Sequence, residues 1–167
     1  MLPYFKIIRF NNWIKNFFVI APLIFSLKLT DINSVALSLV AFITFCIASS
    51  IIYVFNDITD VNKDKLHPRK QTRPLASGDM SIKSAYLLIL LLSILFLFGF
   101  FFINYQTKIV LGLYLLFNLF YNLGLKRVNL LESFSIGINF VLRVLGGCFA
   151  IDVLPSHWII IITFFTA

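Results

Sequence analysis

The sequence predicts an all-α polytopic transmembrane helical bundle, and three observations support this fold class. Hydrophobic residues make up 60% of the 167 residues and charged residues only 13%, about half the charged fraction of a soluble domain. The apolar residues gather in runs near the roughly 20 residues that a spanning helix needs. Lys and Arg cluster at the ends of these runs. We therefore attribute the net charge of +7 to membrane topology and phosphate chemistry, and expect no nucleic-acid partner.

Five apolar segments qualify as spans, and a sixth begins near the end of the chain. They cover residues 13–29, 35–55, 82–103, 109–125 and 130–153, and the sixth starts near residue 156. Each should be helical, because lipid offers no partner to unpaired backbone groups. We expect one transmembrane domain over residues 1–167. A chain that stops inside an apolar segment is expected to be a truncated part of a longer protein.

Positive charge sets the expected orientation. Most of the 14 Lys and Arg residues fall near the N-terminus, in the connection over residues 56–81, or just after residue 125. Such segments usually remain in the cytoplasm. The N-terminus and the 56–81 connection are therefore expected on the cytoplasmic face of a bacterial-type inner membrane. We predict that this connection is the active-site loop.

The 56–81 connection opens with a regular row of aspartates. On a helix, positions i, i+3 and i+7 share one face, so Asp57, Asp60 and Asp64 should line up, with Tyr53 one turn earlier. Carboxylates in such a row repel one another. Mg²⁺ would relieve this repulsion, since it prefers oxygen ligands and completes its coordination with substrate phosphates. We predict a metal site formed by Asn56 and the three aspartates, with Asp57 and Asp60 central to catalysis.

Three cations follow the aspartates. Arg69, Lys70 and Arg73 lie within the same connection. Cations beside a metal-bound diphosphate neutralise the charge that builds on a leaving group, and Arg binds phosphate with two parallel hydrogen bonds. Lys70 and Arg73 are accordingly predicted to be catalytic. The alternative is a merely solvated connector, but the aspartate row followed by cations favours a metal–diphosphate site.

Two pairs of polar residues stand at the inner ends of predicted spans. Lys15 and Asn16 lie where the first span begins, and Tyr121 and Lys126 lie at the end of the fourth. All four are candidates for binding substrate phosphate or the acceptor. Anchoring at the membrane interface explains the same positions, so both explanations stay open here.

Arg143 lies deep inside the fifth predicted span. A charge there costs at least about 2.5 kcal/mol on insertion scales, so it should face a partner or a cavity. Asn139 lies one turn earlier and shares its helix face. An ion pair and a substrate contact are both compatible with the sequence.

These motifs resemble the UbiA superfamily of intramembrane prenyltransferases. Residues 56–64 match its NDxxDxxxD motif, and residues 73–78 match RP(L/I)ASG. The resemblance implies a UbiA-type bundle of roughly nine helices, of which this chain would hold the first part. The second acidic motif of the family lies in the later half, beyond residue 167.

One branch, the decaprenyl-phosphate phosphoribosyltransferases, resembles the chain more closely. Four motifs of that branch recur: RxxxWxKN at 9–16, HPxKxxRP at 67–74, YxxxLK at 121–126 and FxLR at 140–143. The branch implies Mg²⁺ as cofactor, phosphoribosyl pyrophosphate as donor and a polyprenyl (decaprenyl) phosphate as acceptor. It also implies that Lys15, Asn16, Lys70 and Arg73 contact phosphate.

Three functions remain open at this stage. The first is Mg²⁺-dependent transfer of phosphoribose to a polyprenyl phosphate in the bilayer. The second is a UbiA prenyltransferase that moves a polyprenyl group from its diphosphate to an aromatic or other small acceptor. The third belongs to another class, a transporter segment or an inactive fragment, although transporters usually carry internal repeats and broken helices near the midplane.

Overall fold

The computed structural model describes residues 3–123 and 129–166, with side chains described for residues 3–122 and 133–166. Within these ranges all regular structure is helical. Three helical segments are long and apolar enough to cross a membrane: Ile32–Thr59, Ile82–Phe102 and Ser133–Ala150. The chain is therefore an integral membrane protein, and the predicted all-α class is confirmed.

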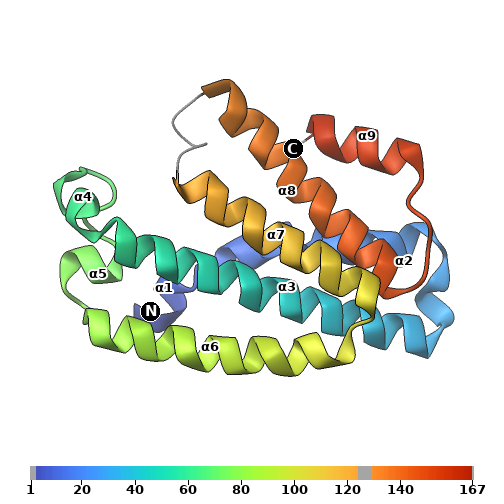
Figure 1. The fold of residues 1–167 in the computed structure, drawn as a ribbon, viewed down its shortest axis with the longest axis horizontal. Helices are drawn as coiled ribbons and strands as arrows, with labels where there is room; N and C mark the ends of the chain where they lie inside the picture. The colour runs from blue at the N-terminus through green and yellow to red at the C-terminus, as the bar shows by residue number, and fades with distance from the viewer. Residues whose placement is uncertain (1–2, 124–128, 167) are drawn as a thin grey trace.

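Helix α3 (Ile32–Thr59) runs through the centre of the bundle, with α6 (Ile82–Phe102) on one side and α7 (Tyr105–Leu123) and α8 (Asn129–Ala150) on the other (Figure 1). Asp31 starts it by accepting hydrogen bonds from the backbone N–H groups of Asn33 and Ser34, which satisfies donors that a helix start leaves free. Helix α9 (His157–Thr166) packs against α8. The largest cluster of buried apolar residues joins α3, α7 and α8.

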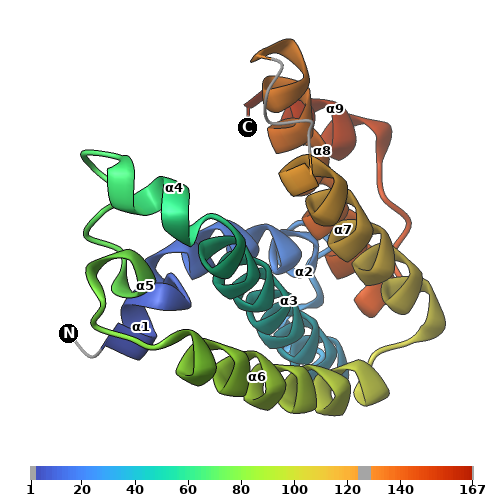
Figure 2. The same cartoon turned by 60° about the vertical axis from the view of Figure 1, so that its left-hand side comes forward.

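Helices α6 and α7 share a turn at residues 103–104 and diverge from it, so that α3 lies between them (Figure 2). Most of α6 faces outward, because it packs mainly on α3. Helix α7 instead packs on α8. This divergence leaves space beside α3 toward the end that carries the aspartates.

The first predicted span differs from the single helix we expected. Its residues fall in a 3₁₀ helix η1 (Phe10–Val19), α2 (Ala21–Phe25) and a 3₁₀ turn η2 (Lys28–Thr30), and a short α1 (Pro3–Ile7) precedes them. Pro22 lies in the first turn of α2, a position that suits proline, whereas a helix running through it would lose a backbone hydrogen bond. Arg9 and Leu27 adopt left-handed backbone conformations directly before η1 and η2, where one element ends and the next begins.

The segment η1 packs against α8 so closely that the two backbones are in contact. A Cβ atom on Gly147 would overlap the main chain of Val19, the last residue of η1. At neighbouring Gly146, a Cβ would overlap the ring of Phe45 from α3. The two glycines thus allow η1, α3 and α8 to come together, and this contact encloses the polar region described next.

Candidate active site

The aspartate cluster, which we define as Asp57, Asp64, Arg9 and Arg73, lies where α3 gives way to α4 (Val61–Leu66). Both aspartates are buried. Arg73 Nη1 donates to Asp57 Oδ1 at 3.1 Å and to Asp64 Oδ2 at 2.6 Å. Arg9 Nη2 donates to the same Asp57 oxygen at 2.7 Å. Two carboxylates from different helices are thereby joined by arginines.

The predicted row of three aspartates on one helix is wrong in detail. Helix α3 ends at Thr59, and Asp60 lies at the break before α4. Asp60 forms an ion pair with Lys63 at 3.6 Å. The carboxylates of Asp57 and Asp64 meet instead because the break redirects the chain, and Arg73 at the start of α5 (Pro74–Ser77) bridges them.

Arg9 was not among the predicted site residues. Its guanidinium lies 4.6 Å from the centre of the Tyr53 ring while it bonds Asp57. The N-terminal motif at residues 9–16 carried a signal for it, because Arg9 is the first residue of that motif. Its partner is 48 residues away, so only the fold shows the pairing.

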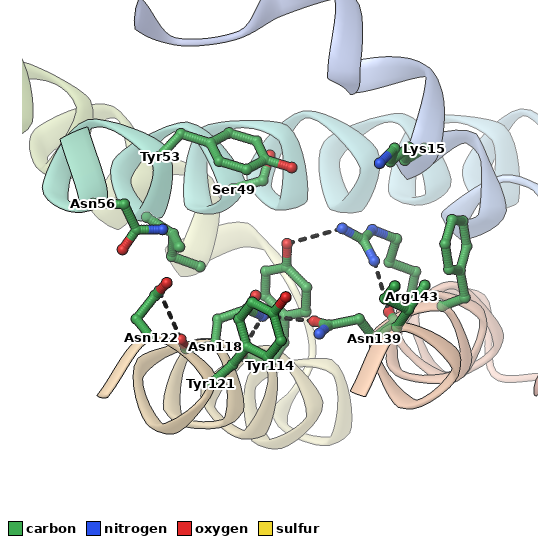
Figure 3. A pocket seen from close by; sticks show the side chains of 13 residues that line it. Lys15, Ser49, Tyr53, Asn56, Tyr114, Asn118, Tyr121, Asn122, Asn139 and Arg143 are labelled. Atoms are coloured by element: carbon green, nitrogen blue, oxygen red, sulfur yellow. Dashed lines mark hydrogen bonds between the residues drawn. The ribbon is translucent and has the colours of Figure 1, made fainter. Parts of the chain in front are cut away.

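A polar cavity of about 240 Å³ lies between η1, α3, α7 and α8 (Figure 3). Ile52, Ile136 and Phe140 contribute apolar walls. Its polar lining combines predicted residues with new ones: Lys15, Ser49, Tyr53, Asn56, Tyr114, Asn118, Tyr121, Asn122, Asn139 and Arg143. Asn56 lies at one end of the cavity and Lys15 and Arg143 lie at the other. The residues of the aspartate cluster are not part of the lining, and Asp57 follows Asn56 directly in the sequence.

Arg143 is buried beside this cavity and is held by neutral groups. Its Nε donates to Asn16 Oδ1 at 2.7 Å, its Nη2 to the Tyr114 hydroxyl at 3.0 Å and its Nη1 to the Asn139 carbonyl at 2.8 Å. The described side chains include no carboxylate that forms an ion pair with it. Of the two explanations left open, the ion pair finds no support in this part of the chain.

Asn16 does not line the cavity. Its side chain is fully buried, donates to Cys46 Sγ at 3.3 Å and to Ser49 Oγ at 3.2 Å, and accepts from Arg143. Asn16 therefore positions another residue: its side chain holds the guanidinium of Arg143 next to α3.

The other predicted residues are distributed unevenly. Lys15, Tyr53 and Tyr121 line the cavity, as does Asn56. The side chain of Lys70 is exposed in the loop before α5, away from the cavity lining, and its predicted role stays a prediction. Lys126 lies outside the described residues.

Apart from Tyr121, the polar residues of α7 that line the cavity were not predicted. Tyr114, Asn118 and Asn122 recur every four residues, which places them on one helix face. That periodicity was visible in the sequence and marks a polar stripe in an otherwise apolar helix. Asn118 Nδ2 also donates to Asn139 Oδ1 at 2.6 Å, which connects the stripe to α8.

The residues at the Asn56 end fit Mg²⁺ with few protein ligands. Asn56 Oδ1 is buried and has no hydrogen-bond partner among the described residues. Asn56 directly precedes Asp57, whose carboxylate shares Arg73 with that of Asp64. Mg²⁺ is often held by one or two carboxylates together with substrate phosphates. The described residues contain no group of three or more His, Cys, Asp or Glu side chains that could hold a metal alone, so a phosphate ligand would have to complete the site.

An apolar hollow of about 230 Å³ adjoins the cavity. It lies between α3, α6 and α7, where the latter two helices diverge, and it shares Ile52 and Asn122 with the polar cavity. The rest of its lining is aliphatic or aromatic: Ile51, Phe55, Ile89, Leu115 and Leu119. A polar cavity and an apolar hollow thus lie side by side, with Ile52 and Asn122 in the lining of both.

Residues 17–167 match the UbiA prenyltransferase family. The chain belongs to the UbiA prenyltransferase family. The resemblance inferred from the motifs is therefore confirmed.

Curated relatives of this UbiA chain include two decaprenyl-phosphate phosphoribosyltransferases. The one from Mycolicibacterium smegmatis is 34% identical over 164 residues, which cover 96% of this chain and 52% of the relative. The one from Corynebacterium glutamicum is 32% identical over 170 residues, which cover 96% of this chain and 49% of the relative. The chain spans about half the length of these relatives.

Among solved structures, a UbiA homolog from Archaeoglobus fulgidus bound to DMAPP and Mg²⁺ has a TM-score of 0.74 and 19% identity. The match covers 98% of this chain and 59% of that one. At this identity the likeness establishes the fold, and it confirms the predicted UbiA-type bundle.

Proposed function

We propose that the protein is a Mg²⁺-dependent membrane transferase that moves phosphoribose from phosphoribosyl pyrophosphate to a polyprenyl phosphate, with decaprenyl phosphate as the best candidate. One observation carries this proposal. Asn56 Oδ1, which is buried and has no hydrogen-bond partner among the described residues, belongs to a residue that lines the polar cavity and directly precedes Asp57 of the aspartate cluster, in a chain 34% identical to a named enzyme of this activity.

The residues of the aspartate cluster suit the donor diphosphate. When bound, Mg²⁺ would link the diphosphate to the protein and neutralise its charge. Asn56, Asp57, Asp60 and Asp64 are the proposed ligands. Arg73 already touches two of these carboxylates, so its guanidinium is within reach of a diphosphate bound there and would stabilise the departing pyrophosphate.

The transfer depends on the correct positioning of the donor and the acceptor more than on a reactive side chain of the protein. The bond between the anomeric carbon of the donor and its diphosphate oxygen breaks, and a bond to a phosphate oxygen of the acceptor forms. Pyrophosphate leaves with the electron pair. Holding the two phosphates in line across the cavity supplies most of the rate gain, because it replaces a bimolecular encounter.

The apolar hollow gives the lipid a place beside the cavity. Its lining is almost wholly apolar, and it opens between α6 and α7. The first isoprene units of a polyprenyl phosphate would lie there while the headgroup enters the polar cavity. The face that carries the aspartate cluster would be cytoplasmic, as the positive charges predict.

The test is pyrophosphate release by the purified chain in detergent, with each candidate donor supplied in turn. Phosphoribosyl pyrophosphate with decaprenyl phosphate should support release in Mg²⁺ and not in EDTA. Asp57→Asn should lower the rate about 100-fold or more, the scale of losing one electrostatic contact at a reacting centre. Asp79→Asn is the matched control, because Asp79 is exposed and bonds only Ser77 among the described side chains. Equal rates for Asp57→Asn and the unchanged protein would refute the metal role.

A second candidate is prenyl transfer from a prenyl diphosphate to a small acceptor. It is favoured by the fold shared with the Archaeoglobus fulgidus homolog, which is bound to DMAPP. Release of pyrophosphate from prenyl diphosphates, but not from phosphoribosyl pyrophosphate, would establish this alternative. Release from neither donor would leave a transporter segment or an inactive fragment.

A further inference from the structure

Arg143 is a permanently charged group in an apolar span with no carboxylate to neutralise it among the described side chains. A guanidinium has five N–H donors. Three of its hydrogen bonds go to Asn16, Tyr114 and the Asn139 carbonyl. Two N–H groups, one on each Nη atom, remain for another acceptor. A buried cation held only by neutral groups is poised for an anion.

Lys15 adds a second positive charge at the same end of the cavity. Both side chains line the cavity and come from different elements, η1 and α8 (Figure 3). Lys15 makes no hydrogen bond or ion pair with a described residue, so its three donors remain available. Two cations on one cavity wall match a dianion better than a monoanion.

This end is separate from the aspartate cluster. Asn16 bonds Ser49 on α3, and Asn56 lies seven residues farther along the same helix. At 1.5 Å per residue this separates the two ends by about 10 Å. A single diphosphate cannot span that length and occupy both ends. The arginine end of the cavity, defined as Lys15, Tyr114, Asn139 and Arg143, therefore needs a second anionic group.

We propose that the arginine end of the cavity is a phosphomonoester site, in which Arg143 and Lys15 bind a terminal phosphate while Asn16 positions Arg143. This inference deepens the proposed function and rests on it for the identity of the phosphate. Two sources have the required chemistry: the headgroup of the polyprenyl phosphate and the 5-phosphate of the donor. A prenyl diphosphate with a neutral acceptor has neither.

Equilibrium binding without turnover tests this proposal. The purified chain, in detergent and EDTA, is titrated with radiolabelled decaprenyl phosphate and separately with ribose 5-phosphate. Arg143→Gln and Lys15→Gln should each weaken binding of the occupying compound by about tenfold or more, as expected for losing a hydrogen bond to a charged group. Lys83→Gln is the control, because Lys83 is an exposed lysine that does not line the cavity, and it should change binding less than about twofold.

The two compounds identify the source. Loss confined to decaprenyl phosphate assigns the lipid headgroup, and loss confined to ribose 5-phosphate assigns the donor. Lys15→Gln guards against misfolding, because Lys15 has no described contact to lose, whereas Arg143 connects three elements. Unchanged affinities in both variants would overturn the proposal. Because no reaction is needed, failure here leaves the donor experiment above unaffected.

Discussion

The aspartate cluster and the arginine end of the cavity both contain arginine side chains, but the charges of these arginines are neutralised differently. In the cluster, Arg9 and Arg73 meet the carboxylates of Asp57 and Asp64. At the other end, Arg143 meets only neutral oxygens. Removing one partner of a buried ion pair leaves an uncompensated charge, so a cluster of this kind is balanced from within. Arg143 keeps its net charge and is suited to a ligand that supplies the opposite one.

The comparison also shows what η1 does. Arg9 stands directly before η1 and reaches the aspartate cluster, while Asn16 inside it reaches Arg143. One irregular segment thus contacts both ends of the site. A straight helix would turn its side chains by a different angle per residue, so the 3₁₀ geometry is part of how both contacts are made.

Displacing η1 should disturb both the aspartate cluster and the arginine end of the cavity, so we expect it to lower the unfolding midpoint more than any other change proposed below. In Gly147→Ala the new Cβ meets the main chain of Val19, which cannot rotate away as a side chain can. Overpacking of this kind costs about 2–3 kcal/mol. Thermal unfolding in detergent should show a clear fall in the midpoint.

Gly112→Ala is the matched control for that experiment. It is a helical glycine on α7 whose added Cβ meets nothing within 4 Å. Alanine is favoured over glycine inside a helix by about 1 kcal/mol, so this variant should keep or raise the midpoint. Equal midpoints for the two variants would mean that η1 is not seated on Gly147.

How much of the fold and of the site could be predicted from the sequence depends on how far apart in the chain the contacting residues lie. The helices from residue 32 onward follow from apolar runs, because lipid forces each run to satisfy its own backbone. Neighbouring motif residues such as Asn56 and Asp57 were identified from spacing alone. The break at Asp60 was not, since several charged residues in a row suit a helix and a turn equally.

Long-range pairing could not be predicted. Asn16 and Arg143 are 127 residues apart, and Asn16 had two acceptable explanations from its local sequence. Its burial and its contact with Arg143 arise only when α8 packs on η1 through Gly147. The sequence therefore predicted several residues that the fold brings together, but it missed Arg9, Tyr114, Asn118 and Asn122, and it could not show which residue positions another.

Breaking only the aspartate cluster should lower the stability of the fold less than displacing η1 does. Arg73→Gln leaves two buried carboxylates facing each other without their shared guanidinium. The loss should be about 1–2 kcal/mol, below the 3–5 kcal/mol of a fully buried pair, because Arg73 is 26% exposed. Mg²⁺ should then raise the unfolding midpoint more in this variant than in the unchanged protein, since the metal takes over the missing positive charge.

The control for Arg73→Gln is Arg69→Gln, which removes an exposed arginine of the same loop whose side chain makes no described contact. It should leave both the midpoint and its Mg²⁺ response nearly unchanged. If Mg²⁺ raised the midpoint equally in all three proteins, or in none, the carboxylates of the cluster would not be the metal ligands.

The smallest effect on stability, and the sharpest test of the comparison, comes from giving Arg143 the carboxylate it lacks. Asn16→Asp keeps an oxygen where Nε of Arg143 donates at 2.7 Å, and adds a negative charge there. The arginine end would then resemble the aspartate cluster, neutralised from within. The unfolding midpoint should change little, because the new ion pair offsets the lost donations to Cys46 and Ser49. Affinity for the phosphomonoester should fall about tenfold, since one unit of positive charge is cancelled.

Asn16→Ala separates the effect of the added charge from the loss of the positioning contact. It removes the contact with Arg143 without adding charge, so it should weaken phosphate binding less than Asn16→Asp does while lowering the unfolding midpoint more. Were Asn16→Asp to bind the phosphomonoester as tightly as the unchanged protein, the net charge of Arg143 would be irrelevant to the ligand, and the difference between the two regions would be one of packing alone.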